Sequence, residues 1–460
     1  MHARLWDELY TEPGGTLCFC SYHQIAEQLD RIHTLDIGPI TFQQWMSSDI
    51  GGVMRTPMVN LNSLILRVDY EDPFRHPEDL ARVVLTQPRI PKLTRLSLQG
   101  FRFPFCTKEV MAGLEELTLG PCKVAHHRLP LMDLILALRR ATRLRHLRIH
   151  DFLSIAEFSA QKISKKALPA LQTLHIEDDP LMIGHLLDAF RLPSCASVSL
   201  TELAPPDRIE PPFLRMLPDD PTTRFAFLGF TLTHLAIAPA GPFVVVSGTA
   251  AAAPGHTLAL RTRTAPFVFA HAVALAARLP PLDTAYLRAL DVAVPAPPHG
   301  NCHVDWAAVL SRAPASVTAL TALTVRAAAA AVPVPMPEGV LDALADARAL
   351  PRLASLDVVG MAYRKGLLAR LVRLGRARPQ LVRIGVGLTG GEGWELGNVE
   401  MGALEVLGPR LEGCSGCLQL WVVPPEDGGG RLELDVEDGA DAAASLTQHL
   451  ECPTLVIASV

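Results

Sequence analysis

Residues 93–101 (LTRLSLQGF) and 114–122 (LEELTLGPC) decide the fold that the sequence predicts. Both stretches contain the pattern L-x-x-L-x-L, formed in the first by Leu93, Leu96 and Leu98. Alternate side chains of an extended strand point to opposite faces, so Leu96 and Leu98 enter one core, and Leu93 turns into it from the preceding loop. One such strand cannot bury its apolar edge alone. The pattern therefore predicts strands that stack side by side.

The same pattern recurs along most of the chain, at intervals of roughly 30 residues and in about 14 copies. The other copies lie at Ile32–Ile37, Leu61–Leu66, Leu144–Ile149, Leu171–Ile176, Cys195–Leu200, Leu232–Ile237, Leu287–Val292, Leu320–Val325, Leu353–Val358, Leu381–Val386, Cys417–Val423 and Cys452–Ile457. Helical patterns separate several copies, as at Leu131, Leu134, Ile135 and Leu138, and further helices are expected over 339–349 and 366–376. Alternating strands and helices predict an α/β fold.

The irregular period and the ladders of Leu, Ile and Val resemble the ribonuclease-inhibitor-like class of leucine-rich-repeat proteins, over about 32–457. The variable repeats and Ala/Pro-rich insertions resemble more narrowly the repeat region of fungal F-box proteins. The first resemblance implies a leucine-rich-repeat solenoid, a curved horseshoe with a parallel inner sheet and outer helices. In the F-box family the repeats capture a substrate, while the F-box docks on the Skp1 adaptor of a cullin ubiquitin ligase (SCF).

The chain departs from the F-box family at its start. The Leu-Pro opening and the helical leucines of an F-box are not found in residues 1–30. This segment is expected to be an N-terminal cap or a remnant, and the chain is either truncated relative to such proteins or a repeat-only protein. Residues 31–460 are expected to form the solenoid, with Pro/Ala-rich insertions near 205–221 and 236–255 that have the composition of loops.

Composition limits the classes of partner. The net charge is −5 and the pI is near 6.3, so the overall balance predicts neither nucleic acid nor a membrane surface as partner. Neither a secretory signal nor a clean apolar span is recognised. Nine cysteines are scattered along the chain, which favours reduced thiols over a disulfide framework. We therefore expect a cytoplasmic or nuclear protein.

The sequence offers weak candidates for chemistry. Cys414 and Cys417 have zinc-knuckle spacing, but the pair that could complete a site, Cys18 and Cys20, has a different spacing. The cluster His299–Asp305 could bind a metal, or it is a solvated loop. A glycine run at 390–393 lacks the Lys-Ser/Thr of a phosphate loop, and no catalytic motif is found. We predict no enzyme activity, no cofactor and no metal site.

The residues that alternate with the ladder leucines are expected to line the concave face. In the N-terminal half these are Arg67, Arg95, Ser97, Glu116, Thr118, His146, Arg148, His150, Thr173, His175 and Glu177. In the C-terminal half they are Ala289, Asp291, Ala322, Thr324, Ser355 and Asp357. The first group is rich in Arg and His and could receive an acidic peptide; the alternative is that its members are simply solvated strand residues.

Three functions follow as hypotheses. The first is a non-enzymatic protein-binding scaffold, the substrate-recognition part of an F-box-type ubiquitin ligase. The second is a free-standing repeat scaffold or inhibitor with no link to ubiquitin. The third is an enzyme whose site lies in the Ala/Pro-rich middle of the chain.

Overall fold

The computed structural model has a mixed α/β fold with far more strand than helix. It describes residues 2–4, 29–41, 45, 55–69, 84–101, 105–106, 108–121, 129–154, 164–203, 215–218, 227–263, 287–295, 306, 320–328, 334–346, 349–362, 367–378, 380–381, 383–389, 418–422, 432–435 and 455–459. The chain divides into two compact units. Unit 1 comprises residues 1–230 and 255–260, and unit 2 comprises 231–254 and 261–460.

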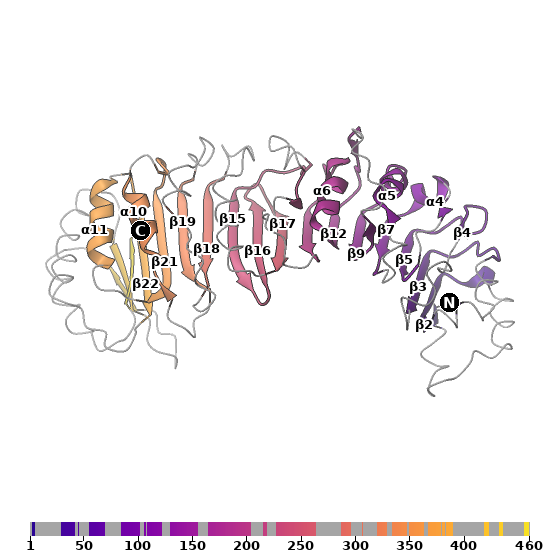
Figure 1. Cartoon of the computed structure of the whole chain (residues 1–460), viewed down its shortest axis with the longest axis horizontal. Helices are drawn as coiled ribbons and strands as arrows, with labels where there is room; N and C mark the ends of the chain where they lie inside the picture. The colour runs from indigo at the N-terminus through magenta and orange to yellow at the C-terminus, as the bar shows by residue number, and fades with distance from the viewer. Residues whose placement is uncertain are drawn as a thin grey trace, which may run out of the picture. The chain divides into compact units, whose positions relative to one another are not determined.

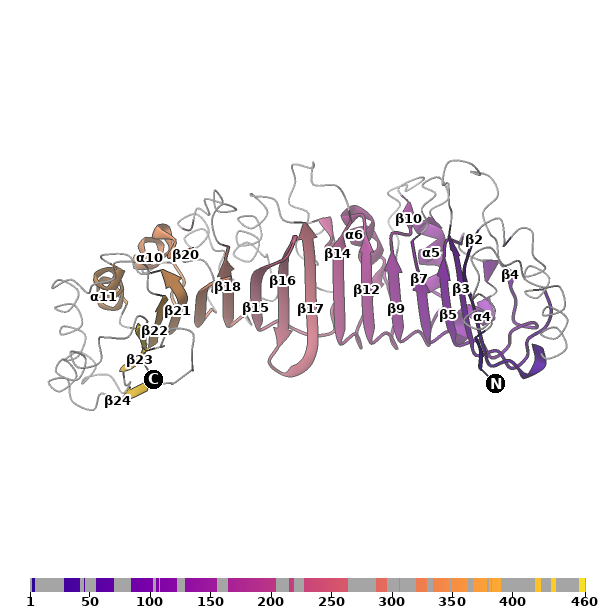
Figure 2. The ribbon, with the colours of Figure 1, turned by 90° about the horizontal axis from the view of Figure 1, so that it is seen from below.

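Unit 1 is built on a parallel sheet whose main strands lie side by side in chain order (Figures 1 and 2). These strands are β1 (His2–Arg4), β2 (Thr34–Thr41), β3 (Ser63–Asp69), β5 (Arg95–Gln99), β7 (Glu116–Leu119), β9 (His146–His150), β12 (Thr173–Asp178) and β14 (Ser197–Glu202). β17 (Ala253–Arg263) pairs with β14, where the Thr257 amide donates to the Ala196 carbonyl at 2.7 Å. Among the described residues this sheet does not close on itself.

The strands are in register, so side chains of the same kind meet across the sheet. One buried row comprises Leu35, Leu64, Leu96, Leu117, Leu147, Leu174 and Val198. A second comprises Ile37, Leu66, Leu98, Leu119, Ile149, Ile176 and Leu200. Each fully buried leucine stabilises the fold by roughly 1.5–3 kcal/mol relative to exposure. We call these two rows the buried ladder of unit 1; they confirm the strand positions expected from the sequence.

A repeated turn delivers each strand to the sheet. The first apolar residue of the pattern donates its amide to a carbonyl three residues earlier, as Leu93 does to Ile90 and Leu171 to Leu168, both at 3.3 Å. Cys195 stands at this position before β14, and its amide bonds Leu192 at 3.2 Å. Cys195 is a buried free thiol, and burial raises its pKa to about 11. This cysteine therefore serves as a small apolar core residue, as the sequence predicts.

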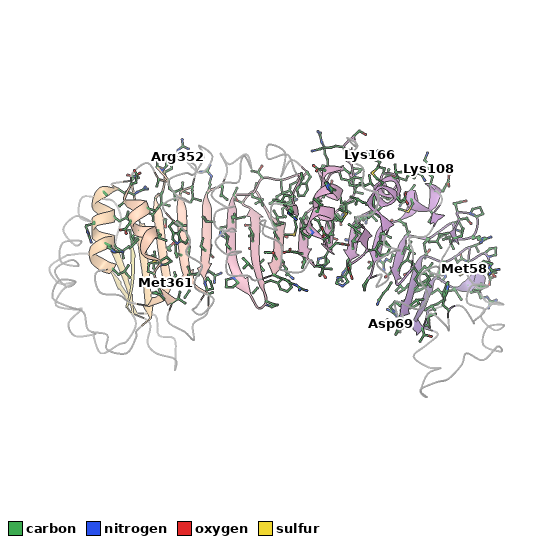
Figure 3. The ribbon with its side chains drawn as sticks, viewed as in Figure 1. Met58, Asp69, Lys108, Lys166, Arg352 and Met361 are labelled. Atoms are coloured by element: carbon green, nitrogen blue, oxygen red, sulfur yellow. The ribbon has the colours of Figure 1, made fainter. Side chains whose placement is uncertain are left out.

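Helices of unit 1 lie together on one side of its sheet (Figure 1). They are α4 (Lys108–Gly113), α5 (Leu131–Leu138) and α6 (Pro180–Asp188), and three short parallel strand pairs accompany them: β4 (Val84–Leu85) with β6 (Phe105–Cys106), β8 (Leu129–Pro130) with β10 (Leu153–Ser154), and β11 (Lys166–Ala167) with β13 (Phe190–Arg191). The four apolar residues expected to line α5 are all buried. Lys108 and Lys166 mark this helical side (Figure 3).

Unit 2 repeats the parallel arrangement and adds antiparallel strands. The parallel strands, in order, are β15 (His234–Ala240), β18 (Ala289–Val294), β19 (Ala322–Ala327), β21 (Ser355–Ala362) and β22 (Arg383–Thr389). β16 (Phe243–Ala250) pairs antiparallel with β15, and β20 (Val334–Pro335) extends beside β21. β25 (Leu455–Ser459) joins β22 antiparallel, followed by β23 (Leu418–Val422) and β24 (Leu432–Asp435). Arg352 lies in the turn before β21, and Met361 lies near the C-terminal end of that strand (Figure 3).

Two helices of unit 2, α10 (Glu338–Ala345) and α11 (Leu367–Ala377), agree with the expected helical segments. Arg378, which follows α11, is fully buried. Its guanidinium donates to the carbonyls of Leu344, Asp346, Ala349 and Leu350, and the bond to Leu350 measures 2.9 Å. Burial lowers the pKa of Arg378, against the opposing charge of Asp346. The arginine thus satisfies backbone groups at and beyond the C-terminus of α10.

The expectation of a loop-like insertion over 236–255 is wrong in its local structure. This segment lies within β15, β16 and the start of β17, and Val244, Val246 and Ala250 alternate into the core. The proposed insertion at 205–221 lies largely outside the described residues, as does most of the segment 1–30. None of the helices in the described ranges combines the length and apolar character of a membrane span.

Candidate functional site

The candidate site is the face of the unit 1 sheet opposite its buried ladder, which we call the open face. Two rows of side chains cross it in register. The first comprises Thr34, Ser63, Arg95, Glu116, His146, Thr173 and Ser197. The second comprises Asp36, Ile65, Ser97, Thr118, Arg148, His175 and Ser199. Arg67 on β3 and His150 and Glu177 on β9 and β12 lie farther along their strands. The structure thus brings all eleven predicted residues to one face.

Arg67 is held by the neighbouring strand. Its Nη2 donates to Asp36 Oδ1 at 2.7 Å and to the Gly38 carbonyl at 3.1 Å. Gly38 has φ +110°, and an added Cβ would lie 2.2 Å from the Arg67 carbonyl oxygen. Glycine is therefore required where β2 passes close to β3. Asp36 was missed by the sequence reasoning, although it occupies the same alternating position in its own strand.

Arg95 also has an acidic partner. Its Nε lies 3.1 Å from Glu116 Oε1 on the next strand, and these residues face one another in the register. Both side chains are well exposed, so solvent screens the pair and its contribution to stability is small. Arg95 nevertheless already has an acidic neighbour within the sheet. One alternation farther along the same two strands, Ser97 on β5 and Thr118 on β7 are register partners and add two hydroxyl groups to the face.

Histidines occupy the part of the open face formed by β9 and β12. His146 Nδ1 lies 2.8 Å from Thr173 Oγ1, its register partner. Two imidazoles share the carboxylate of Glu177: His150 Nδ1 lies 2.5 Å from Oε2, and His175 Nε2 lies 2.7 Å from Oε1. This arrangement of His150, Glu177 and His175 fixes three side chains across two strands.

The two histidines control the ionisation of Glu177. Partial burial by itself would raise the pKa of this carboxyl group. Hydrogen bonds from His175 and then His150, together with their charge, outweigh that effect and leave the pKa below its usual range. Glu177 is therefore a carboxylate at neutral pH, and both of its oxygens are occupied.

Arg148 differs from the other two arginines of the open face. It is exposed on β9, between Thr118 on β7 and His175 on β12. Within the described ranges its guanidinium has neither an acidic partner nor a hydrogen bond, in contrast to Arg67 and Arg95. Its planar fork is thus available for a carboxylate or a phosphoryl group.

A buried aspartate supports this part of the face from behind. Asp178, at the end of β12, is fully buried, and its Oδ2 accepts from the amides of Phe152 at 2.8 Å and Leu153 at 2.9 Å. It fixes the chain that leaves β9 immediately after His150. The sequence reasoning did not identify Asp178, which lies two residues beyond the predicted copy Leu171–Ile176 and enters the strand only in the structure.

The equivalent face of unit 2 is sparser. Small residues, Ala289, Ala322 and Ser355, succeed one another in one row. Asp291, in the next row, accepts from Arg326 Nε through both carboxylate oxygens, each at 3.1 Å. Arg326 thus offsets the charge of Asp291, a pairing that the sequence reasoning did not include.

The structure does not describe the weak candidates for chemistry. Outside the described residues fall Cys414, Cys417, the 299–305 cluster and the glycine run at 390–393. Among the residues that the structure does describe, no group of three or more potential ligands is placed to hold a metal. No protein-family model, curated protein or solved structure matches the chain significantly. The chemistry of the open face is therefore the basis of the functional proposal.

Proposed function

We propose that the chain is a leucine-rich-repeat solenoid that works as a non-enzymatic protein-binding scaffold. The observation that carries this proposal is the pair of rows on the open face, which cross neighbouring parallel strands and are polar at every position except Ile65. Such a surface offers side chains at fixed spacing on a rigid sheet, which suits recognition of another protein. Strands in register, the recurrent turn before them and the helices on the other side support the solenoid architecture.

The substrate-recognition role in an F-box-type ubiquitin ligase is the more specific form of this proposal. It rests on the resemblance of the repeats to fungal F-box proteins, and Skp1 with a cullin would then be further partners. The second form is a free-standing scaffold or inhibitor, whose partner occupies the same face without any link to ubiquitin. Both forms need a protein partner, and neither needs nucleic acid, a membrane or a cofactor.

Affinity purification with quantitative mass spectrometry tests the proposal. Wild-type chain is compared with a variant whose open face is blocked by Ser97→Tyr and Thr118→Tyr. The matched control carries Lys108→Tyr and Lys166→Tyr, which add the same two rings to the helical side (Figure 3). We expect a stoichiometric partner that the blocked variant loses and the control retains.

The identity of the retained proteins separates the two forms. The ubiquitin-ligase form would be supported if wild type, the blocked variant and the control all retain Skp1 and a cullin, while a further partner is lost from the blocked variant alone. A single recurring partner without Skp1 would support the free-standing scaffold. Partners that persist on the blocked variant at wild-type level would contradict binding at the open face.

A further inference from the structure

We infer that Arg148 anchors an acidic segment of the partner protein by pairing with a carboxylate or phosphoryl group. The inference deepens the proposed function and rests on it, since it names the chemistry of the partner at one point of the open face. Arg67 is paired with Asp36 at 2.7 Å and Arg95 with Glu116 at 3.1 Å, so each of these arginines already has an acidic neighbour.

An acidic residue on each strand beside β9 lies one alternation from the register partner of Arg148, and both have partners of their own: Glu116 on β7 pairs with Arg95, and Glu177 on β12 with two histidines. Glu177 lies one alternation beyond His175, the register partner of Arg148, and its two oxygens are taken by His150 and His175. The histidines therefore hold the carboxylate that would otherwise compete for the guanidinium. This leaves Arg148 as a cation whose counter-ion is not supplied by the described part of the chain.

The surroundings of Arg148 favour an anion. Thr118 contributes a hydroxyl group from β7, and His146 and His175 contribute imidazoles from the same strand and the next one. Hydroxyl and imidazole groups can donate hydrogen bonds to the oxygens that a guanidinium does not reach. Hydrogen bonds to Thr173 and Glu177 already hold the imidazoles of His146 and His175, so little side-chain freedom is lost on binding apart from that of Arg148 itself.

The occupant is an acidic protein segment that approaches the face with its side chains. β9 is paired on both edges, by β7 and β12, so its backbone is not open to an added strand. Recognition must then come from side chains above the sheet. Glutamate, aspartate and phosphoserine share the oxygen chemistry that fits a guanidinium fork.

Fluorescence anisotropy with defined peptides tests the anchor. The probes are three labelled, end-capped peptides of equal length that alternate glycine with glutamate, phosphoserine or glutamine. The variants are Arg148→Gln and a control, Arg191→Gln, which removes the same charge from an exposed site on the helical side. We expect wild type and the control to bind an acidic peptide alike, and Arg148→Gln to bind about tenfold more weakly. Arg148→Lys should recover part of this loss.

The arms of the experiment have distinct meanings. Stronger binding of the phosphoserine peptide than of the glutamate peptide assigns the site to a phosphorylated partner, and the reverse assigns it to a carboxylate-rich one. Equal weakening by Arg148→Gln and Arg191→Gln would mean diffuse attraction and would overturn the anchor, as would the absence of binding to either acidic peptide.

Failure of the anchor is distinguishable from failure of the scaffold proposal. If the Ser97→Tyr and Thr118→Tyr variant loses its cellular partner while Arg148→Gln retains it in full, the open face binds protein but Arg148 is not its anchor. If the blocked variant keeps every partner, the scaffold proposal itself is wrong. A urea unfolding midpoint equal to that of wild type verifies that each variant is folded.

Discussion

Unit 1 and unit 2 share a buried framework and differ in what they place on the opposite face. Leu117 and Leu147 pair across β7 and β9 in unit 1 as Leu290 and Leu323 pair across β18 and β19 in unit 2, and all four are buried. On the other face, unit 1 carries linked arginine, histidine and glutamate side chains. Unit 2 carries a succession of small residues beside the pair of Asp291 and Arg326.

The comparison separates two kinds of sequence information. The buried positions set the register of the strands, because a shift by one residue would turn every leucine away from the core. The alternating positions are free of that constraint. Their chemistry can differ between the units without changing the strands that carry it, which makes them the place to look for function.

The largest effects should come from the framework and be alike in both units. Leu147→Ala in unit 1 and Leu356→Ala in unit 2 should each lower the free energy of unfolding by ~2–5 kcal/mol, because each removes a buried side chain. Urea denaturation measures the change. Leu136→Ala is the control, since Leu136 on α5 is 48% exposed and should cost less than about 0.5 kcal/mol. A loss below that level at Leu147 would remove it from the core.

Glycine substitutions should distinguish the two units. Gly38→Ala in unit 1 should cost about 3 kcal/mol, because its φ is +110° and the new Cβ would meet the Arg67 carbonyl at 2.2 Å. In unit 2, Gly385→Ala brings a Cβ equally close to Asp357 Oδ1, the end of a side chain that can rotate away. We expect a loss of about 1 kcal/mol or less there. Equal losses in thermal unfolding would refute the backbone argument.

Arginine replacements should rank in the opposite order. Arg378→Met in unit 2 should cost ~2–3 kcal/mol, because it leaves several buried carbonyls without their donor. Arg67→Met in unit 1 should cost less than about 1 kcal/mol, since the Arg67 side chain is 36% exposed and its ion pair is screened. Unfolding is measured in urea, because a guanidinium salt used as denaturant would change the ionic strength. A smaller loss at Arg378 than at Arg67 would contradict the role assigned to the buried guanidinium.

The smallest effect should be the pH dependence contributed by Glu177. Its pKa is lowered in the folded state, so between the folded and unfolded pKa values the unfolded chain binds more protons. The resulting stability is present above the ordinary pKa of 4.5 and is lost as the pH falls through the folded value. Glu177→Gln should remove this contribution, which solvent screening keeps below about 1 kcal/mol. The difference between the urea unfolding midpoints at pH 7 and pH 3 should therefore be smaller for the variant than for wild type. A difference equal to that of wild type would count against the lowered pKa of Glu177.

The parallel strands that carry the leucine pattern could be predicted from sequence in both units, because their information is local. A leucine at every second position reports directly on a face that is buried. Pairs across strands were harder, since the partnership of Arg67 with Asp36 or His150 with Glu177 depends on register between distant segments. The positions of these residues on one face were predictable, whereas the partner of each charged side chain was not.

The failures have physical causes as well. The segment 236–255 has the Ala, Pro and Gly content of a loop, and the consecutive valines 244–246 do not reveal the alternating burial that β16 has in the sheet. Arg378 was not among the residues singled out from the sequence. Its burial follows from four carbonyls brought together by α10 and the chain beyond it, and no short window of sequence contains both sides of that contact.

The strand β17 has a consequence for how the chain becomes folded during synthesis. Residues 255–260 belong to unit 1, although the chain on either side of them belongs to unit 2. A ribosome that has released only the first 230 residues has therefore not yet supplied the segment that pairs with β14. Until Leu260 emerges, that edge of the nascent sheet offers unpaired amides and carbonyls to other chains. The edge of β14 would therefore need protection, for example by a chaperone, while residues 231–260 are being synthesised.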